Sequence, residues 1–208
     1  LWHQGMMRKP GTGPNPDAPT DSPSGITHSG KQVFDAPTSA EVDDMVMAYA
    51  NAAGEAVRLG FDAIEIHGAH GYLIDEFFWD VMNKRDDRFG GSLPERATFA
   101  GDIIKETRKQ VGPDVAIILR FSQWKQQDYT ARLAQTPAEF EAFLKVFVDA
   151  GATVRKLDDL EARLDKGEFD LVAVGRALLQ DPDWAKKVRE GRISELTNYD
   201  AKSLATLY

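Results

Sequence analysis

The sequence predicts a parallel α/β fold, specifically a (β/α)8 TIM barrel, of which the 208 residues cover only part of the strands. Helical segments with apolar residues every three or four positions alternate with short, uninterrupted apolar runs, as in parallel sheets covered by helices. Three of these runs end directly in histidine, glycine or arginine, and they lie at 61–66, 115–119 and 171–174. Polar residues at the carboxyl ends of several parallel strands are typical of barrel enzymes, which build their active sites there.

The beginning of the chain predicts little regular structure. We interpret residues 1–5 as the end of a strand. Residues 6–37 are rich in proline and glycine and have neither a helical nor a strand period. We therefore expect a long loop there, with one brief strand at 31–34.

Capping signals locate the helices. Thr38 and Glu41 have the spacing of a capping box and open a helix that we expect to end at Gly60. Ser92 and Glu95 repeat that spacing before a second helix with its own apolar stripe. Further helices are predicted at 137–150, at 157–164 and after residue 181.

The number of strands is too small for a closed barrel. An eight-unit barrel takes about 250 residues, whereas this sequence contains three full strands and the opening remnant. The helix that ends near Gly151 is followed by another helical stretch where a strand is due. We therefore expect one barrel domain, residues 1–208, that lacks strand-bearing segments before Leu1 and near residues 151–155.

Composition and charge exclude several classes of protein. The net charge of −8 argues against binding to nucleic acid or to anionic membranes. The sequence has no apolar run long enough to span a membrane, no signal-peptide pattern and no cysteine, so it offers no disulfide and no thiolate metal ligand. We expect a cytoplasmic enzyme that acts on a small molecule, and the sequence leaves open whether it forms a homo-oligomer.

The first apolar run leads into the residues that we expect to carry the chemistry. His67, His70 and Tyr72 follow it within a turn that contains two glycines. Neutral imidazoles can donate hydrogen bonds, and a phenol is a weak acid. Together these groups could hold a substrate oxygen and deliver a proton beside it.

A longer motif around these residues closely resembles the Old Yellow Enzyme family, which are FMN-dependent ene-reductases on a (β/α)8 barrel. The motif consists of His67-Gly68-Ala69-His70-Gly71-Tyr72-Leu73-Ile74, Phe77-Phe78 and residues 83–96. The likeness extends to Leu1-Trp2, to Leu119-Arg120 with Ser122, and to Val174-Gly175-Arg176 with Asp181-Pro182 and Trp184.

The resemblance implies an activity and a set of substrate contacts. Enzymes of this family take hydride from NAD(P)H and reduce the activated C=C bond of α,β-unsaturated carbonyl or nitro compounds. By the same resemblance, His67 and His70 bind the carbonyl or nitro oxygen, and Tyr72 donates the proton. Trp2 matches an aromatic residue that lines the substrate pocket.

The resemblance also implies FMN as the cofactor. Arg120 matches the arginine beside the flavin pyrimidine, where a guanidinium stabilises the negative charge of reduced flavin. Gly175 and Arg176 match the site of the FMN phosphate, which favours a backbone turn with an arginine before a helix. The sequence departs from the family at Asp86, where Thr is common, and at Phe89, where Tyr is common.

Two other functions stay open on the residues alone. His67 and His70 have the spacing of a metal-binding pair, with Asp75 or Glu76 as a third ligand, so the same barrel could be a metal-dependent hydrolase or aldolase. The other alternative is a non-catalytic remnant that cannot hold a cofactor. We favour the flavin enzyme and expect no metal, because the sequence shows no second cluster of ligands.

Overall fold

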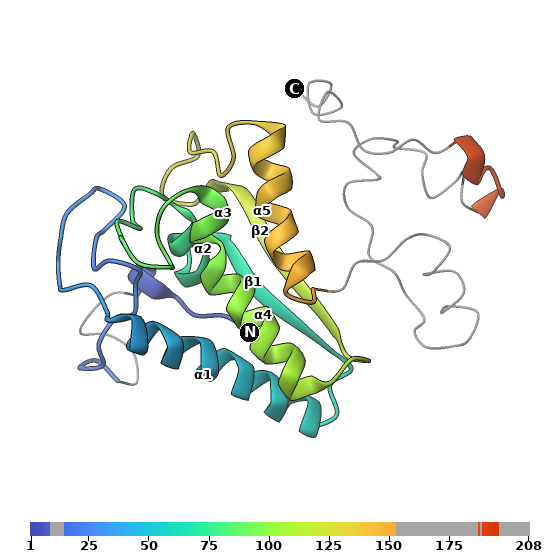
Figure 1. Cartoon of the computed structure of the whole chain (residues 1–208), viewed down its shortest axis with the longest axis horizontal. Coiled ribbons are helices and arrows are strands. Elements are labelled where there is room, and N and C mark those ends of the chain that lie inside the picture. The colour runs from blue at the N-terminus through green and yellow to red at the C-terminus, as the bar shows by residue number, and fades with distance from the viewer. Residues whose placement is uncertain (9–14, 153–186, 188, 196–208) are drawn as a thin grey trace. The chain divides into compact units, whose positions relative to one another are not determined.

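The computed structural model describes residues 1–8, 15–152, 187 and 189–195, and it divides the chain into two units, Leu1–Val154 and Arg155–Tyr208 (Figure 1). In the second unit the described residues include a short 3-10 helix, η2 (Ile193–Glu195). The helix predicted at 157–164 and the strand predicted at 171–176 lie outside the described residues. These two elements, the single domain and the missing segments therefore stay predictions.

The first long helix, α1 (Ser39–Arg58), begins where the capping box predicts it. The Thr38 hydroxyl accepts the backbone N–H of Glu41 at 3.2 Å, and the Glu41 carboxylate accepts the N–H of Thr38 at 2.7 Å. Backbone donors that have no partner inside the helix are thereby satisfied. One side of α1 is buried, through Val42, Val46, Tyr49, Ala50 and Ala53.

The sheet that the structure describes has two parallel strands, β1 (Ala63–His70) and β2 (Ala116–Lys125). Their register is regular from Ala63 opposite Ala116 to Gly68 opposite Phe121. Parallel strands need a crossover connection, and α4 supplies it here. This pair confirms the predicted alternation of parallel strands and helices for the described part of the chain.

Both strands continue further than the sequence predicts. The apolar runs predict ends at residue 66 and near Arg120, whereas the strands extend to His70 and Lys125. The prediction is wrong because the hydrogen bonds between parallel backbones do not require apolar side chains. At the other end, Phe61 precedes β1 and is 63% exposed, so it does not belong to a buried strand.

The helix predicted from Ser92 is divided into two, α3 (Leu93–Arg96) and α4 (Thr98–Val111). The capping box formed by Ser92 and Glu95 is present at the start of α3. α4 carries most of the buried apolar stripe and packs along α1.

One further helix is confirmed, and a short one is missed by the sequence analysis. α5 (Pro137–Asp149) follows its predicted cap, since the Thr136 hydroxyl accepts the N–H of Glu139 at 3.1 Å. The missed helix, α2 (Leu73–Phe78), directly follows Tyr72. Figure 1 shows α1, α4 and α5 side by side in that order, on the near side of the two strands.

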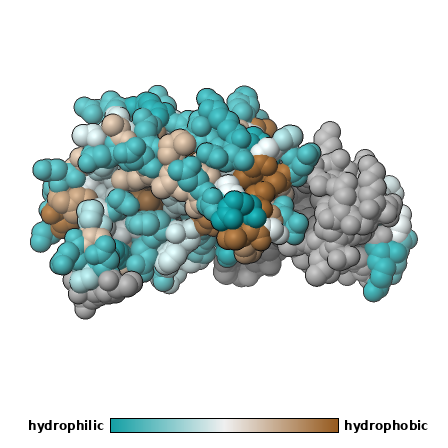
Figure 2. Space-filling model, turned by 90° about the horizontal axis from the view of Figure 1, so that it is seen from below, coloured by the Kyte–Doolittle hydropathy of each residue, from teal (hydrophilic) through white to brown (hydrophobic). Residues whose placement is uncertain are grey.

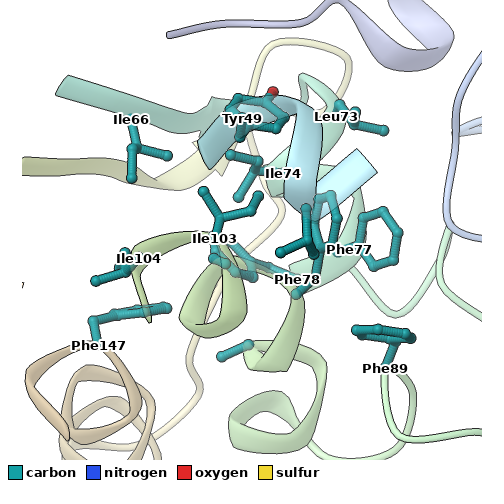
Figure 3. Packing of buried hydrophobic residues seen from close by; sticks show 14 of the residues in the cluster. Tyr49, Ile66, Leu73, Ile74, Phe77, Phe78, Phe89, Ile103, Ile104 and Phe147 are labelled. Atoms are coloured by element: carbon teal, nitrogen blue, oxygen red, sulfur yellow. The ribbon is translucent and has the colours of Figure 1, made fainter. Parts of the chain in front are cut away.

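Phenylalanine side chains join these helices into one core (Figure 3). Phe77 of α2 stacks on Phe99 of α4 with ring centroids 3.9 Å apart, and Phe78 meets Phe143 of α5 edge-on at 5.0 Å. Buried aromatic pairs of this kind contribute about 0.5–1.5 kcal/mol beyond the area they bury. Because α2 begins directly after Tyr72, this packing also fixes the residues at the end of β1.

The segment before α1 is mostly a loop, as predicted, but it begins with a short 3-10 helix, η1 (Gly5–Met7), and the strand end predicted at residues 1–5 does not form. Its described residues from 15 to 37 contain no helix and no strand, apart from an isolated antiparallel bridge between Ile26 and Gln32. The bridge includes one residue of the brief strand predicted at 31–34, and no strand forms there.

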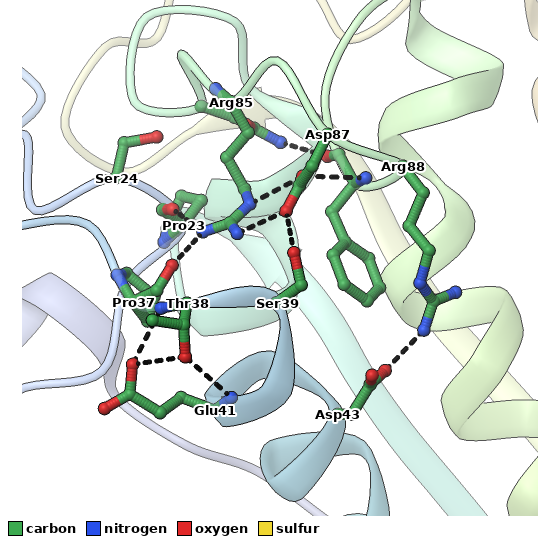
Figure 4. Close-up of polar contacts among 12 residues, drawn as sticks. Pro23, Ser24, Pro37, Thr38, Ser39, Glu41, Asp43, Arg85, Asp87 and Arg88 are labelled. Atoms are coloured by element: carbon green, nitrogen blue, oxygen red, sulfur yellow. Dashed lines mark hydrogen bonds and ion pairs between the residues drawn. The ribbon is translucent and has the colours of Figure 1, made fainter.

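An arginine from a distant segment holds this loop in place (Figure 4). Arg85 donates to the carbonyl oxygen of Pro23 at 2.9 Å and to that of Pro37 at 2.7 Å, and it pairs with the carboxylate of Asp87. The Arg85 side chain is only 7% exposed, so its charge needs these partners. Residues 83–96 of the family motif thus have a structural role in tying the loop to the body of the unit.

The surface of the described part is largely hydrophilic on the face in Figure 2, with hydrophobic residues gathered most densely to the right of centre in that view. Ile118 of β2 is 47% exposed, so the described helices do not cover both faces of the strand pair. Among the described residues, no helix combines the length and the apolar character that crossing a membrane requires. The cytoplasmic location and a homo-oligomer stay predictions.

Candidate active site

The end of β1 and the turn after it bring the three predicted catalytic side chains together. The ring centroids of His67 and His70 are 5.6 Å apart, and those of His67 and Tyr72 are 5.5 Å apart. His70 is the last residue of β1, and Tyr72 is the N-cap of α2. The three side chains are close enough to contact one small molecule.

Trp2 adjoins this group from the beginning of the chain. Its ring meets that of Tyr72 edge-on, with centroids 5.1 Å apart, and Trp2 is 52% exposed. The neighbouring residue Leu1 lies along β1, where its carbonyl oxygen accepts the N–H of His67 at 2.9 Å. Trp2 is therefore a wall beside Tyr72 and not part of the core, and its contact with substrate stays a prediction.

One nitrogen of His67 is buried without a partner. The Nε2 atom makes no hydrogen bond within the described part of the chain. Buried polar atoms without a partner are rare and costly, so this nitrogen has an unused hydrogen-bonding capacity next to His70 and Tyr72. An oxygen of a bound molecule would satisfy Nε2 if this nitrogen carries the imidazole proton.

The surroundings of the two histidines favour their neutral form. Burial lowers the pKa of His67, and the nearby charges of His70 and Arg120 lower it further. Burial likewise lowers the pKa of His70, with added effects from Arg120 and Lys125. At neutral pH each imidazole is thus uncharged and offers one N–H as a hydrogen-bond donor.

Arg120 lies beside the histidines because the two strands pair there, and not because β2 ends at this residue. It stands opposite His67 in the register of β1 and β2, in the middle of β2 and not at its end. Residues directly opposite in a parallel pair share a face of the sheet. The exposed guanidinium is therefore on the same face as the His67 imidazole, where a negatively charged ring system would meet it.

The sequence analysis misses an aromatic pair next to His70. The Trp124 ring stacks on the His70 imidazole with centroids 4.7 Å apart, and the Tyr129 ring stacks on Trp124 at 5.4 Å. Both residues follow Arg120, where the apolar run ends. Phe121 and Trp124, which favour strands, are the signal that β2 continues.

The metal-site alternative lacks its third ligand. Asp75 binds Lys125 with one carboxylate oxygen and the N–H of Gly71 with the other, while Glu76 accepts the N–H of Met6 at 2.7 Å. The described residues contain no group of three or more His, Cys, Asp or Glu side chains that could hold a metal ion. The pair of histidines is better suited to binding an oxygen atom.

Gly175 and Arg176, the predicted phosphate site, are outside the described residues, so that assignment stays a prediction. A cavity of about 620 Å³ lies between the loop before α1 and α1 itself, and His3, Asp21 and Tyr49 are among the residues that line it. None of the three predicted catalytic residues lines this cavity.

Comparison with known proteins gives consistent matches. Residues 1–156 match the model of the NADH:flavin oxidoreductase / NADH oxidase family. An NADH oxidase from Thermoanaerobacter brockii is 30% identical over a region that covers 94% of this chain and 36% of that protein. 12-oxophytodienoate reductase 2 from Arabidopsis thaliana is 31% identical, with 90% of this chain and 62% of that protein covered.

The solved structures include an Old Yellow Enzyme homologue from Zymomonas mobilis. It is 25% identical to this chain with a TM-score of 0.58, and the match covers 98% of this chain and 68% of that one. This similarity confirms the predicted (β/α)8 barrel as the fold class, with β1 and β2 as two of its parallel strands. The chain spans only 36% and 62% of the lengths of the two relatives named above.

The family match extends over most of the chain and includes all the described strands and long helices. It confirms the predicted resemblance to Old Yellow Enzyme, and it confirms a flavin and nicotinamide oxidoreductase, with FMN and NAD(P)H, as the enzyme class of the family. On the sequence match and the shared fold together, the chain belongs to the NADH:flavin oxidoreductase / NADH oxidase family.

Proposed function

We propose that this protein uses FMN and NAD(P)H to reduce the activated C=C bond of α,β-unsaturated carbonyl or nitro compounds. The observation that carries the proposal is the grouping of His67, His70 and Tyr72, with the buried Nε2 of His67 lacking a partner. Two hydrogen-bond donors and a proton donor around one small volume are what this reaction needs from the protein.

The residues that would hold FMN are Arg120 and, outside the described part, Gly175 and Arg176. Arg120 fits this role because its exposed guanidinium shares a face of the sheet with His67. When bound, FMN supplies the hydride. A fixed guanidinium beside the pyrimidine ring favours the reduced, negatively charged form of the cofactor.

The two histidines act on the oxygen of the substrate. A neutral imidazole can donate its N–H to a carbonyl or nitro oxygen without placing a full positive charge in the site. Donation to this oxygen withdraws electron density from the conjugated C=C bond, so that the β-carbon accepts hydride more readily. The name of the relative 12-oxophytodienoate reductase 2 refers to an oxo compound, and this supports the carbonyl part of the proposal.

Tyr72 supplies the proton that completes the reduction. The phenol is a weak acid, and it lies 5.5 Å from the imidazole of His67 between ring centroids. A substrate whose oxygen is held by the histidines can therefore present its α-carbon to the Tyr72 hydroxyl. Trp2, in edge-on contact with Tyr72, limits the positions that the phenol ring can take.

The test is to assay the purified flavin-loaded protein anaerobically with NAD(P)H and either a cyclic enone or a nitroalkene. We expect one equivalent of saturated product for each NAD(P)H consumed. The competing outcome is that NAD(P)H is consumed only when oxygen is present and neither alkene is reduced. That result would make the protein an oxidase and would overturn the proposed substrate class.

A further inference from the structure

The last residue of β1 and the residue after it have left-handed backbone conformations. His70 has a φ of 64° and Gly71 a φ of 85°. Glycine adopts such a φ freely, but a histidine with positive φ is uncommon and is maintained only by its surroundings. The geometry of this turn matters because it sets how the His70 imidazole and the Tyr72 phenol are placed relative to each other.

Both backbone groups of His70 are bound, one by the end of β2 and the other by the residue that follows β2. The N–H of His70 donates to Oγ of Ser122 at 2.9 Å, and the carbonyl oxygen of His70 accepts the N–H of Gln126 at 3.3 Å. The Ser122 hydroxyl in turn donates to the carbonyl oxygen of Trp124 at 2.7 Å. The same segment therefore binds the backbone of His70 and places the Trp124 ring against its imidazole.

Both backbone groups of Gly71 are bound as well, by side chains. Its N–H donates to Oδ2 of Asp75 at 2.7 Å, and its carbonyl oxygen accepts from Nε2 of Gln127 at 3.0 Å. A side chain at this position would be strained by the positive φ, and its Cβ would lie 1.9 Å from the Gln127 amide oxygen, so that the Gln127 side chain would have to move. All four polar backbone groups of the left-handed pair thus have partners.

The partners are brought there by a bulge in β2. Gly68 is opposite Phe121, but two residues later on β1 His70 is opposite Lys125, four residues later on β2. The extra length of β2 turns this segment toward the end of β1. Bulges of this kind often redirect side chains next to active sites.

A fully buried ion pair fixes one of these partners. Nζ of Lys125 binds Oδ1 of Asp75, and both side chains are 0% exposed. Burial raises the pKa of the Asp75 carboxyl, while Lys125 and the N–H of Gly71 act in the opposite direction. A cation in the bulge thus favours the ionised carboxylate that accepts the N–H of Gly71.

We propose that the bulged end of β2 and the two residues after it, Ser122–Gln127, together with Asp75 form a clamp of positioning residues that sets the His70–Tyr72 turn for catalysis. This inference rests on the proposed function, because the clamp matters through the oxygen contact of His70 and the proton from Tyr72. None of its side chains needs to touch substrate. Loss of one clamp bond leaves every reacting group present but displaces it, and a displacement of about 1 Å in an active site costs about 100-fold in rate.

The decisive comparison is between Asp75→Asn, at a fully buried aspartate, and Asp87→Asn, at a half-buried one. Both aspartates pair with a shielded cation and accept a backbone N–H, since Asp87 binds Arg85 and the N–H of Phe89. Asp87 lies outside the candidate site, so its variant reports the general effect of losing such a pair. We expect both variants to lower the melting temperature.

Only Asp75→Asn is expected to change the site. In the cofactor-free protein, hydrogen exchange at the amides of His70 and Gly71 should accelerate at least about tenfold relative to Asp87→Asn. In the flavin-loaded protein, reoxidation by an enone should slow by about 10- to 100-fold, whereas reduction by NAD(P)H should stay within about twofold. If Asp75→Asn does not fold, Gln127→Ala removes one clamp bond from a half-buried side chain and has the same expected signature.

The experiments distinguish a failure of the clamp proposal from a failure of the proposed function. Equal exchange rates in the aspartate variants, or unchanged enone reoxidation in an active Asp75→Asn protein, would overturn the clamp while leaving the function intact. A wild-type protein that does not reduce alkenes would overturn the proposed function. In that case the exchange comparison still decides whether Asp75 holds the turn.

Discussion

Tyr72 can be tested by separating the two halves of the proposed reaction. Reduction by NAD(P)H needs no acid, whereas reduction of the alkene needs a proton at the α-carbon. Tyr72→Phe keeps the ring, and with it the contact to Trp2, but removes the acidic proton. We expect stopped-flow reduction by NAD(P)H to be nearly unchanged and enone-driven reoxidation to slow by about 100- to 10,000-fold, the usual contribution of a general acid.

Tyr49→Phe is the matched control for this substitution. The Tyr49 hydroxyl is buried and makes no hydrogen bond within the described part of the chain, but it belongs to α1 and not to the site. Both half-reactions should be unaffected by its loss. If Tyr72→Phe behaves like Tyr49→Phe in reoxidation, Tyr72 is not the proton donor.

Replacing either His67 or His70 should weaken ligand binding. Replacing His67 by Ala removes a donor from a buried site, and hydrogen bonds of this kind are worth about 1–3 kcal/mol. We expect the Kd of a phenol or an enone, measured by titration of the flavin spectrum, to rise by about 10- to 100-fold. His70→Ala should behave similarly, and His28→Ala, at an exposed loop position, should leave the Kd unchanged.

At the scale of elements, the buried carboxyl of Glu76 in α2 predicts a pH dependence of stability. Burial raises the pKa of Glu76 well above its usual value of 4.5, and Asp75 and Asp21 add to this, while the N–H of Met6 opposes it. The folded state therefore holds this proton at pH values where the unfolded state has lost it. The contribution of Glu76 to the free energy of unfolding therefore falls as the pH rises above 4.5.

Glu76→Gln removes this dependence while keeping an oxygen for the N–H of Met6. The free energy of unfolding of the variant relative to wild type should increase as the pH rises above 4.5, with a slope of up to about 1.4 kcal/mol per pH unit, and its melting temperature should rise with it. Arg85 lowers the pKa of Asp87, so Asp87 contributes its full stability above pH 3.8. The difference in the free energy of unfolding between Asp87→Asn and wild type should therefore not change with pH above that value. A flat difference for Glu76→Gln would show that this carboxyl is ionised in the folded protein.

The elements also show what the sequence can predict. The caps at Thr38 and Thr136 locate helix starts correctly, because the signal and the structure it specifies lie within four residues. The ends of β1 and β2 are predicted wrongly, since they depend on pairing between strands. The bond from His70 to Ser122 joins residues 52 positions apart, so neither residue alone predicts the clamp.

At the scale of the whole molecule, the candidate site is assembled from three separate segments. Trp2 comes from the beginning of the chain, His67 to Tyr72 from the end of β1, and Trp124 with its neighbours from the bulge of β2. Parallel strands bring such segments to one edge of the sheet even when they are far apart in sequence. The sequence therefore predicts that Trp2, His67, His70 and Tyr72 share the site, but it misses Trp124, and the distances follow only from the fold.

The last prediction concerns the cofactor and uses the whole protein. A ligand that binds only the folded state stabilises it, by about 2.7 kcal/mol when its concentration is 100 times its Kd. We expect protein stripped of cofactor to melt at temperatures that rise with FMN concentration, and denatured holoprotein to release FMN. Riboflavin, which lacks the phosphate, is the matched control and should stabilise less, because Gly175 and Arg176 are predicted to bind that phosphate. Release of FAD, or equal stabilisation by riboflavin and FMN, would contradict the assigned phosphate site.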